Sequence, residues 1–106
     1  MFTIRDATVD DCAILLDLIR GLAEYERLTH LMSATESTLK DALFGSRPGA
    51  EALLAFEHDD PVGFAVFFHN FSTFLGRRGL WLEDIFMRPK HRRKAARIDH
   101  EPFEFV

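Results

Sequence analysis

Cysteine is nearly absent from this 106-residue chain, in which Cys12 is the only one. A single cysteine cannot form an internal disulfide, and it excludes metal sites built from several thiolates. Histidine offers no alternative, because none of the five residues has the short spacing of paired metal ligands: His30, His58, His69, His91 and His100. We therefore expect no metal cofactor.

Long apolar runs are missing too. No stretch approaches the roughly 20 apolar residues that a membrane-spanning helix needs. The N-terminus has no basic segment followed by an apolar one, as a secretory signal would. The sequence also has no nucleophile elbow, no phosphate-binding Gly-Lys loop and no internal repeat. These absences predict a single cytoplasmic domain without a membrane partner.

Hydrophobic residues make up 47% of the chain, and eleven of them are phenylalanine, which is enough for a packed core. The formal net charge is −4, but the charges are unevenly distributed. Twelve of the seventeen acidic residues lie in residues 1–60, whereas six of the thirteen basic residues lie in residues 88–97. An acidic first half suits a cationic substrate and a basic segment suits an anionic cofactor, although two solvated surfaces would give the same pattern.

Periodicity predicts four strands and two helices in the order β-α-α-β-β-β, an α/β (α+β) fold. We expect the strands at residues 2–5, 52–56, 62–68 and 80–87, with turns at residues 59–61 and 76–79. The last three strands run consecutively and leave an exposed edge, which predicts pairing with another chain and hence a homodimer.

Capping signals set the expected helix ends. Thr8 with Asp11 three residues later opens the first helix, which continues to about Arg27. Ser33 and Glu36 form a second capping pattern, for a shorter helix that ends at Gly45. Gly21 lies inside the first helix, where it predicts a modest local weakness.

The segment 80–94 is expected to organise the domain. It is predicted to be a buried strand that carries Glu83 and Asp84, ends at Pro89 and continues into a basic run. Burying an unpaired carboxylate is unfavourable, so the two acids predict ion-pair partners, a water-filled cleft or a catalytic role. Strand alternation sends them to opposite faces, which excludes a paired acid–base dyad on one side.

These motifs resemble those of the Gcn5-related N-acetyltransferases (GNAT), most closely the diamine (spermidine/spermine) and thialysine acetyltransferases. Five motifs in the family's order carry the resemblance: residues 4–8 with Asp11, 22–26, 62–65, 71–74 and 82–89. The resemblance implies a mixed sheet, and it implies that residues 1–94 are the N-terminal part of such a domain. It leaves residues 95–106 as an atypical tail, with the C-terminal half of the usual domain missing.

The resemblance also implies a reaction, the transfer of acetyl from acetyl-CoA to a primary amine of a small polyamine or lysine-like substrate. Glu83 is then the candidate catalytic residue that accepts the ammonium proton through water. The implied substrate-binding residues are Tyr25, Glu26 and Asp84. The implied cofactor-binding groups are the strand backbone of Ile85, Phe86 and Met87 and the basic side chains of Arg92, Arg93 and Lys94. Ordinary structural roles are the alternatives. Tyr25 would continue the apolar stripe of the first helix, and Glu26 would be a solvated residue at its end. Glu83 and Asp84 would form ion pairs at the end of their strand.

Two departures from the family pattern predict impaired activity. The family holds the pyrophosphate on a glycine-rich turn, but Ala95 and Arg97 occupy the glycine positions here. Its general acid is a tyrosine in the later half of the domain, whereas Tyr25 is the only tyrosine of this chain.

Two other classes of function remain open, a non-catalytic dimerising remnant and a small protein that binds nucleic acid through residues 88–97. The acidic net charge and the lack of interleaved aromatics make nucleic acid the weaker of the two.

Overall fold

The computed structural model describes residues 2–90 and the backbone of residues 103–105. The elements, in chain order, are β1 (Phe2–Asp6), η1 (Val9–Asp11), α1 (Cys12–Tyr25), η2 (Thr29–Leu31), α2 (Glu36–Phe44), β2 (Glu51–Glu57), β3 (Asp60–Ser72), β4 (Arg77–Met87) and β5 (Phe103–Phe105). The predicted order of four strands and two helices is confirmed. Among the described residues, no helix is long and apolar enough to cross a membrane.

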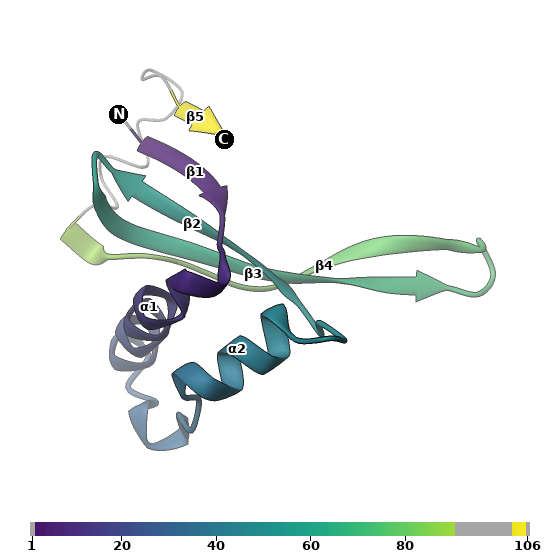
Figure 1. The fold of residues 1–106 in the computed structure, drawn as a ribbon, viewed down its shortest axis with the longest axis horizontal. Helices are drawn as coiled ribbons and strands as arrows, with labels where there is room; N and C mark the ends of the chain where they lie inside the picture. The colour runs from purple at the N-terminus through teal and green to yellow at the C-terminus, as the bar shows by residue number, and fades with distance from the viewer. Residues whose placement is uncertain (1, 91–102, 106) are drawn as a thin grey trace.

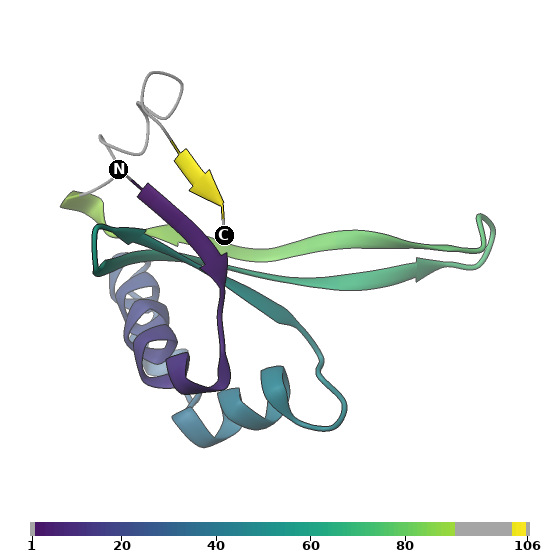
Figure 2. The ribbon, with the colours of Figure 1, turned by 45° about the horizontal axis from the view of Figure 1, so that its top comes forward.

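The strands form one sheet in the order β4-β3-β2-β1-β5. β1 to β4 pair antiparallel with their neighbours, whereas β5 lies parallel to β1 and was not predicted from the sequence. Both α1 and α2 cover the same face of this sheet (Figure 1). Turning the molecule shows β3 and β4 continuing well beyond the body as a long hairpin (Figure 2).

The core lies between the helices and the sheet. Its fully buried centre includes Leu15 and Leu18 from α1 and Leu54 from β2, and Phe64 of β3 and Phe86 of β4 pack against them. The apolar stripe that the helical spacing predicted for α1 is therefore confirmed. A smaller cluster on the sheet contains Phe2, Ala55 and Val62.

The connection from β1 to α1 is held by one buried carboxylate, that of Asp11. The Arg5 guanidinium donates to both of its oxygens, at 2.7 and 2.9 Å, and the Thr8 backbone N–H donates at 2.7 Å. The Asp11 side chain is only 8% exposed, and its hydrogen bonds with Arg5 lower its pKa to about 2. The predicted helix start at Thr8 and Asp11 is thus confirmed, with the 3₁₀ turn η1 inserted before α1.

The prediction that residues 80–87 form a buried strand is wrong. Only Phe86 is buried, and four of its apolar neighbours are more than half exposed: Leu80, Trp81, Leu82 and Ile85. The reason is position, because β4 is the outermost strand of the sheet among the described residues and most of it extends past the helices (Figure 1). The turn before it also falls earlier than predicted, at residues 73–76, where Gly76 adopts a positive φ of 66°.

The predicted N-cap of α2 is wrong by two residues. Thr35, not Ser33, precedes the helix, and its hydroxyl accepts the Thr38 backbone N–H at 3.1 Å. Thr38 reciprocates, since its hydroxyl accepts the Thr35 backbone N–H at 2.9 Å. The helix ends at Gly45, as predicted.

Replacing Thr35 by alanine is expected to lower the free energy of unfolding by about 1 kcal/mol, because the Thr38 backbone N–H loses its acceptor at the start of the helix. Urea denaturation monitored by circular dichroism measures this loss. Ser33→Ala is the matched control, since it also removes an exposed hydroxyl two residues earlier. Equal losses in the two variants would contradict the cap at Thr35.

Candidate functional site

The end of α1 brings several predicted site residues against β4. The helix finishes with Tyr25, and the chain then reverses at Arg27, which adopts a positive φ of 58°. The reversal is fixed by a hydrogen bond from the Leu28 backbone N–H to the Ala23 carbonyl, at 2.8 Å. The segment leading to α2 therefore folds back along α1.

Two neighbouring pockets lie along this contact between α1 and β4. We call the first the acidic pocket; it contains two carboxylates above an apolar lining, and its residues are Ile19, Leu22, Ala23, Glu26, Leu28, Leu31, Met32, Ser33, Ala34 and Asp84. Glu26 directly follows α1 and Asp84 comes from β4, so residues 58 positions apart converge here. Within the part of the chain that the structure describes, neither carboxylate has an ion-pair partner.

The second, which we call the mixed-charge pocket because two acidic and two basic residues line it, lies beside it at the end of β4. Its lining residues are Gly21, Glu24, Tyr25, Asp60, Phe86, Arg88, Pro89 and Lys90. Tyr25 is 56% exposed, and its ring lies 6.5 Å from that of Phe86. Tyr25 thus contributes to this second pocket, while the two other predicted substrate-binding residues share the first.

Gly21 has a role that its helix propensity did not reveal. A Cβ at this position would lie 3.2 Å from the Phe86 ring, so the glycine permits the close approach of α1 to β4. Arg88 at the end of β4 adds a second link to this helix, since it donates to the Asp17 carboxylate at 2.7 Å. The walls of both pockets depend on this close packing.

Glu83 lies at an irregularity in β4. Val66 of β3 is opposite Asp84 and Phe67 is opposite Leu82, so Glu83 is the extra residue of a β-bulge. Regular alternation, which was used to place the two acids, does not hold across a bulge. Both carboxylates are exposed, and their predicted burial is therefore wrong. An exposed pair has no desolvation penalty that would demand a partner.

The predicted cofactor-binding residues are placed only in part. Ile85, Phe86 and Met87 form the end of β4, on the edge of the sheet, and Ile85 is 70% exposed. The basic residues Arg92, Arg93 and Lys94 lie outside the described residues.

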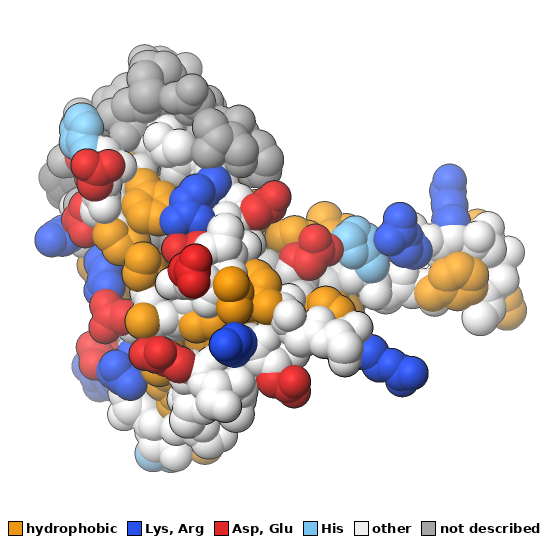
Figure 3. All heavy atoms as spheres, in the orientation of Figure 1, with side chains coloured by type: hydrophobic (Ala, Val, Ile, Leu, Met, Phe, Trp, Pro, Cys, Tyr) orange, Lys and Arg blue, Asp and Glu red, His pale blue; other side chains and the backbone are white. Residues whose placement is uncertain are grey.

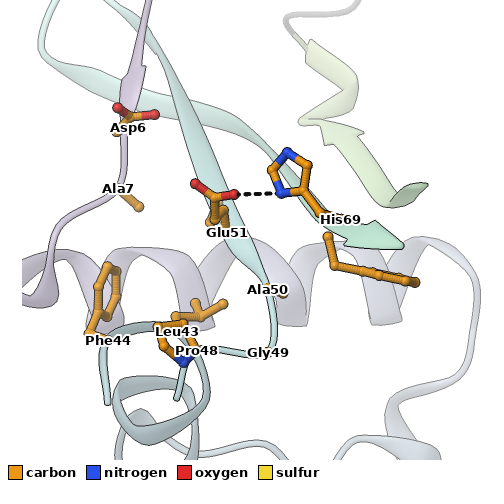
Figure 4. Close-up of a pocket in the computed structure, with 11 residues that line it drawn as sticks. Asp6, Ala7, Leu43, Phe44, Pro48, Gly49, Ala50, Glu51 and His69 are labelled. Atoms are coloured by element: carbon orange, nitrogen blue, oxygen red, sulfur yellow. Dashed lines mark ion pairs between the residues drawn. The ribbon is translucent and has the colours of Figure 1, made fainter. Parts of the chain in front are cut away.

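A third pocket, of about 510 Å³, lies at the start of β2, close to the C-terminal end of α2 and to the part of β3 where the β3–β4 hairpin begins to extend beyond the helices. Glu51 and His69 meet in it with a carboxylate–imidazole distance of 3.3 Å, and Asp6 lies across from them (Figure 4). Its floor is apolar and comes largely from α2, with Leu43 and Phe44. Nothing in the sequence pattern had indicated this pocket, which contains none of the predicted site residues.

Comparison with known proteins identifies the family of this arrangement. The model of the acetyltransferase (GNAT) family matches residues 15–96. The chain is 36% identical over 97 residues to a thialysine N-epsilon-acetyltransferase from Bos taurus, covering 84% of this chain and 56% of that protein. It is 34% identical to an L-ornithine N5-acetyltransferase from Arabidopsis thaliana, with 87% and 60% covered. The chain thus spans about three fifths or less of the length of these relatives.

Solved structures agree on the fold. An aminoglycoside acetyltransferase from an uncultured soil metagenomic sample superposes with a TM-score of 0.72 at 13% identity, covering 100% of this chain and 78% of the other. A ribosomal-protein-alanine N-acetyltransferase from Brucella melitensis gives 0.69 at 16% identity, with 100% and 81% covered. The family match and these superpositions together show that the chain belongs to the GNAT acetyltransferase family.

Proposed function

We propose that this chain acts on a small amine that carries a second cationic group, and that acetyl-CoA is the acetyl donor. The observation that carries the proposal is the acidic pocket, in which Glu26 and Asp84 converge from α1 and β4. Two carboxylates above an apolar lining suit an aliphatic chain with an ammonium group. The names of the relatives, which act on ornithine and thialysine, support the same class of substrate.

Glu26 and Asp84 would bind the far ammonium of the substrate. The apolar residues between them, such as Leu22 and Leu28, would contact the methylene chain. A polyamine, ornithine and a thialysine-like amino acid all combine these two features. Binding of this kind positions the other amine without consuming a proton.

Glu83 would accept the proton of the reacting amine, directly or through water. A primary amine with a pKa of about 10 is almost fully protonated at pH 7 and cannot attack a thioester in that form. This exposed carboxylate is the extra residue of the bulge and directly precedes Asp84, the acid proposed to bind the substrate. β-bulges occur next to active sites because they redirect a side chain, and this supports the catalytic assignment.

Acetyl-CoA would supply the activated acetyl group. The edge position of β4 fits its pantetheine arm, because an extended ligand adds to a sheet edge as a further strand would. Ile85, Phe86 and Met87 would hold this arm. Lys90 would attract its phosphates together with Arg88, which also pairs with Asp17, and Glu24 and Asp60 in the same mixed-charge pocket would oppose this attraction. The sequence fits the pyrophosphate less well, since Ala95 and Arg97 replace the small residues of a backbone cradle.

Mass spectrometry of the acetylated amine, over long incubations at saturating acetyl-CoA with ornithine, thialysine and spermidine as substrates, tests the proposal, because turnover is expected to be slow. Glu83→Gln is expected to lower this slow rate on the order of 10²-fold at pH 7 and much less near pH 10, where the free amine is abundant. Glu51→Gln, in the pocket of Figure 4, is the matched control and is expected to leave the rate unchanged at both pH values. An equal loss at every pH in Glu83→Gln would assign this residue a structural role.

A further inference from the structure

The pocket of Figure 4 lies on the side of the sheet that the helices cover, and its lining residues all belong to the described part of the chain. Its volume of about 510 Å³ falls within the usual range for small-molecule sites, roughly 300 to 1,000 Å³. None of its lining residues belongs to the acidic or the mixed-charge pocket. It is therefore a separate cavity, to which the proposed function assigns no role.

Backbone hydrogen bonds hold the walls of this cavity in place. The loop from α2 to β2 is tied back to the helix, because the Gly49 backbone N–H donates to the Ala42 carbonyl at 2.8 Å. On the other side, the Ala7 backbone N–H donates to the Ala52 carbonyl at 2.9 Å and fixes the chain just after β1 against β2. A cavity with fixed walls does not have to be ordered by its ligand, and this favours binding.

The cavity carries negative charge. Asp6 and Glu51 line it from β1 and β2, and no described lysine or arginine does. In the space-filling view, acidic and histidine side chains lie side by side at the base of the hairpin, next to hydrophobic ones (Figure 3). Glu51 contacts His69 through one oxygen, Oε2, at 3.3 Å, and Asp6 has no ion-pair partner among the described residues. Because a carboxylate has about four acceptor positions, both acids keep capacity for a cationic ligand.

Beside these charged groups the lining is apolar. Leu43 and Ala52 are buried at the cavity, and Phe44 and Pro48 add further apolar surface. An apolar floor contributes nothing to the binding of a bare metal ion, and no group of His, Cys, Asp or Glu among the described residues is arranged to hold one. An anion would meet two carboxylates and be repelled. The lining therefore suits an organic cation that combines a charged end with an apolar chain.

From these observations we propose that this cavity binds a primary amine with a short aliphatic chain, at a site outside the candidate active site. The ammonium lies between Asp6 and Glu51, where each carboxylate accepts one of its N–H groups. The aliphatic chain lies on Leu43 and Phe44, and the removal of its methylene groups from water adds to the affinity. This site does not rest on the proposed function, because acetyl transfer at Glu83 would use none of these groups.

Nuclear magnetic resonance titration with hexylamine tests the site, because backbone amide signals report where a ligand binds. The amides of residues 49–52 are expected to shift and to saturate. Two matched ligands separate the two features of the cavity: hexanol has the same chain without the charge, and methylamine has the charge without the chain. Both are expected to bind roughly tenfold more weakly than hexylamine. Equal binding of hexanol would overturn the recognition of a cation, and the lack of saturable shifts at residues 49–52 would overturn the site.

Variants that remove charge test the contacts. The double variant Asp6→Asn with Glu51→Gln is expected to weaken hexylamine binding at residues 49–52 roughly tenfold. Both side chains are exposed, so the chain is expected to stay folded. Asp59→Asn, in the exposed turn after β2, is the matched control, and Glu26→Gln tests the acidic pocket; both are expected to leave these shifts unchanged. Unchanged binding in the double variant would overturn the proposal, and so would an equal loss in either of the other two.

Discussion

Replacing Asp11 by alanine is expected to lower the free energy of unfolding by about 3 kcal/mol, near the lower end of the range for removing one partner of a buried ion pair. The carboxylate is 8% exposed and accepts hydrogen bonds from Arg5 and from the Thr8 backbone, so its loss leaves several donors without their acceptor. Arg5 remains 34% exposed and is partly rehydrated, which keeps the loss below the upper end of the range. Urea denaturation at pH 7 measures it.

Asp10 provides the control, because it is an exposed aspartate in the same 3₁₀ turn. Asp10→Ala is expected to change stability by less than about 0.5 kcal/mol. A similar loss in both variants would mean that the turn needs its negative charge in general rather than the contacts of Asp11.

The same carboxylate gives stability a definite dependence on pH. Its hydrogen bonds with Arg5 lower its pKa from 3.8 to about 2, so the unfolded chain binds the proton more readily than the folded chain. The stabilisation is therefore complete above about pH 4 and is lost as the pH falls toward 2. In unfolding experiments across this window, the stability difference between the unmodified chain and Asp11→Asn is expected to shrink as the pH falls. A constant difference would contradict the lowered pKa.

Local pattern was sufficient to predict the order of elements. The apolar spacing through Leu15 and Leu18, the capping pair of Thr8 and Asp11, and the stop at Gly45 all depend on residues close in the sequence. Such signals operate within one helix or one turn, so they remain valid whatever the rest of the chain does. The Ser33 pattern failed only because another hydroxyl, that of Thr35, lies nearby and starts the helix later.

The errors about β4 have a different origin. An apolar strand sequence is the same for a central strand as for an edge strand, and only the sheet order decides which it becomes. The bulge at Glu83 likewise arises from the register between β3 and β4, which no spacing within β4 reveals. Gly21 matters because it leaves room for the ring of Phe86, which lies 65 positions later in the sequence. The candidate site is built at such long-range contacts, so sequence supplied its residues but not their arrangement.

The strength of CoA binding is the second large effect expected, and it follows from how the phosphates would be held. A backbone cradle at a helix N-terminus binds phosphate through directed hydrogen bonds, and side chains such as that of Arg97 obstruct one. What remains is charge attraction from Arg88, Lys90 and the basic residues that follow. Charge attraction between exposed groups is strongly screened, because the Debye length falls from about 30 Å at 0.01 M salt to about 3 Å at 1 M.

We therefore expect weak CoA binding by the 106-residue chain that is lost over this range of salt, together with little turnover. Calorimetric titration of CoA at low and high salt measures the first, and the acetylated-amine assay measures the second. Lys90→Ala is expected to weaken binding at low salt, whereas Arg47→Ala, in a loop that lines neither the acidic nor the mixed-charge pocket, is expected to leave it unchanged.

Introducing glycine at positions 95 and 97 separates two possible causes of weak CoA binding, obstruction of the phosphates by side chains and the lack of directed backbone donors. If obstruction by side chains were the whole defect, these substitutions would restore salt-insensitive binding and turnover together. We expect neither to return, because two glycines remove the obstruction without supplying the directed backbone donors of a helix N-terminus, and because the only tyrosine of the chain is Tyr25, on α1. Rapid acetylation that persists at 1 M salt would contradict this account, since charge attraction alone does not survive such screening.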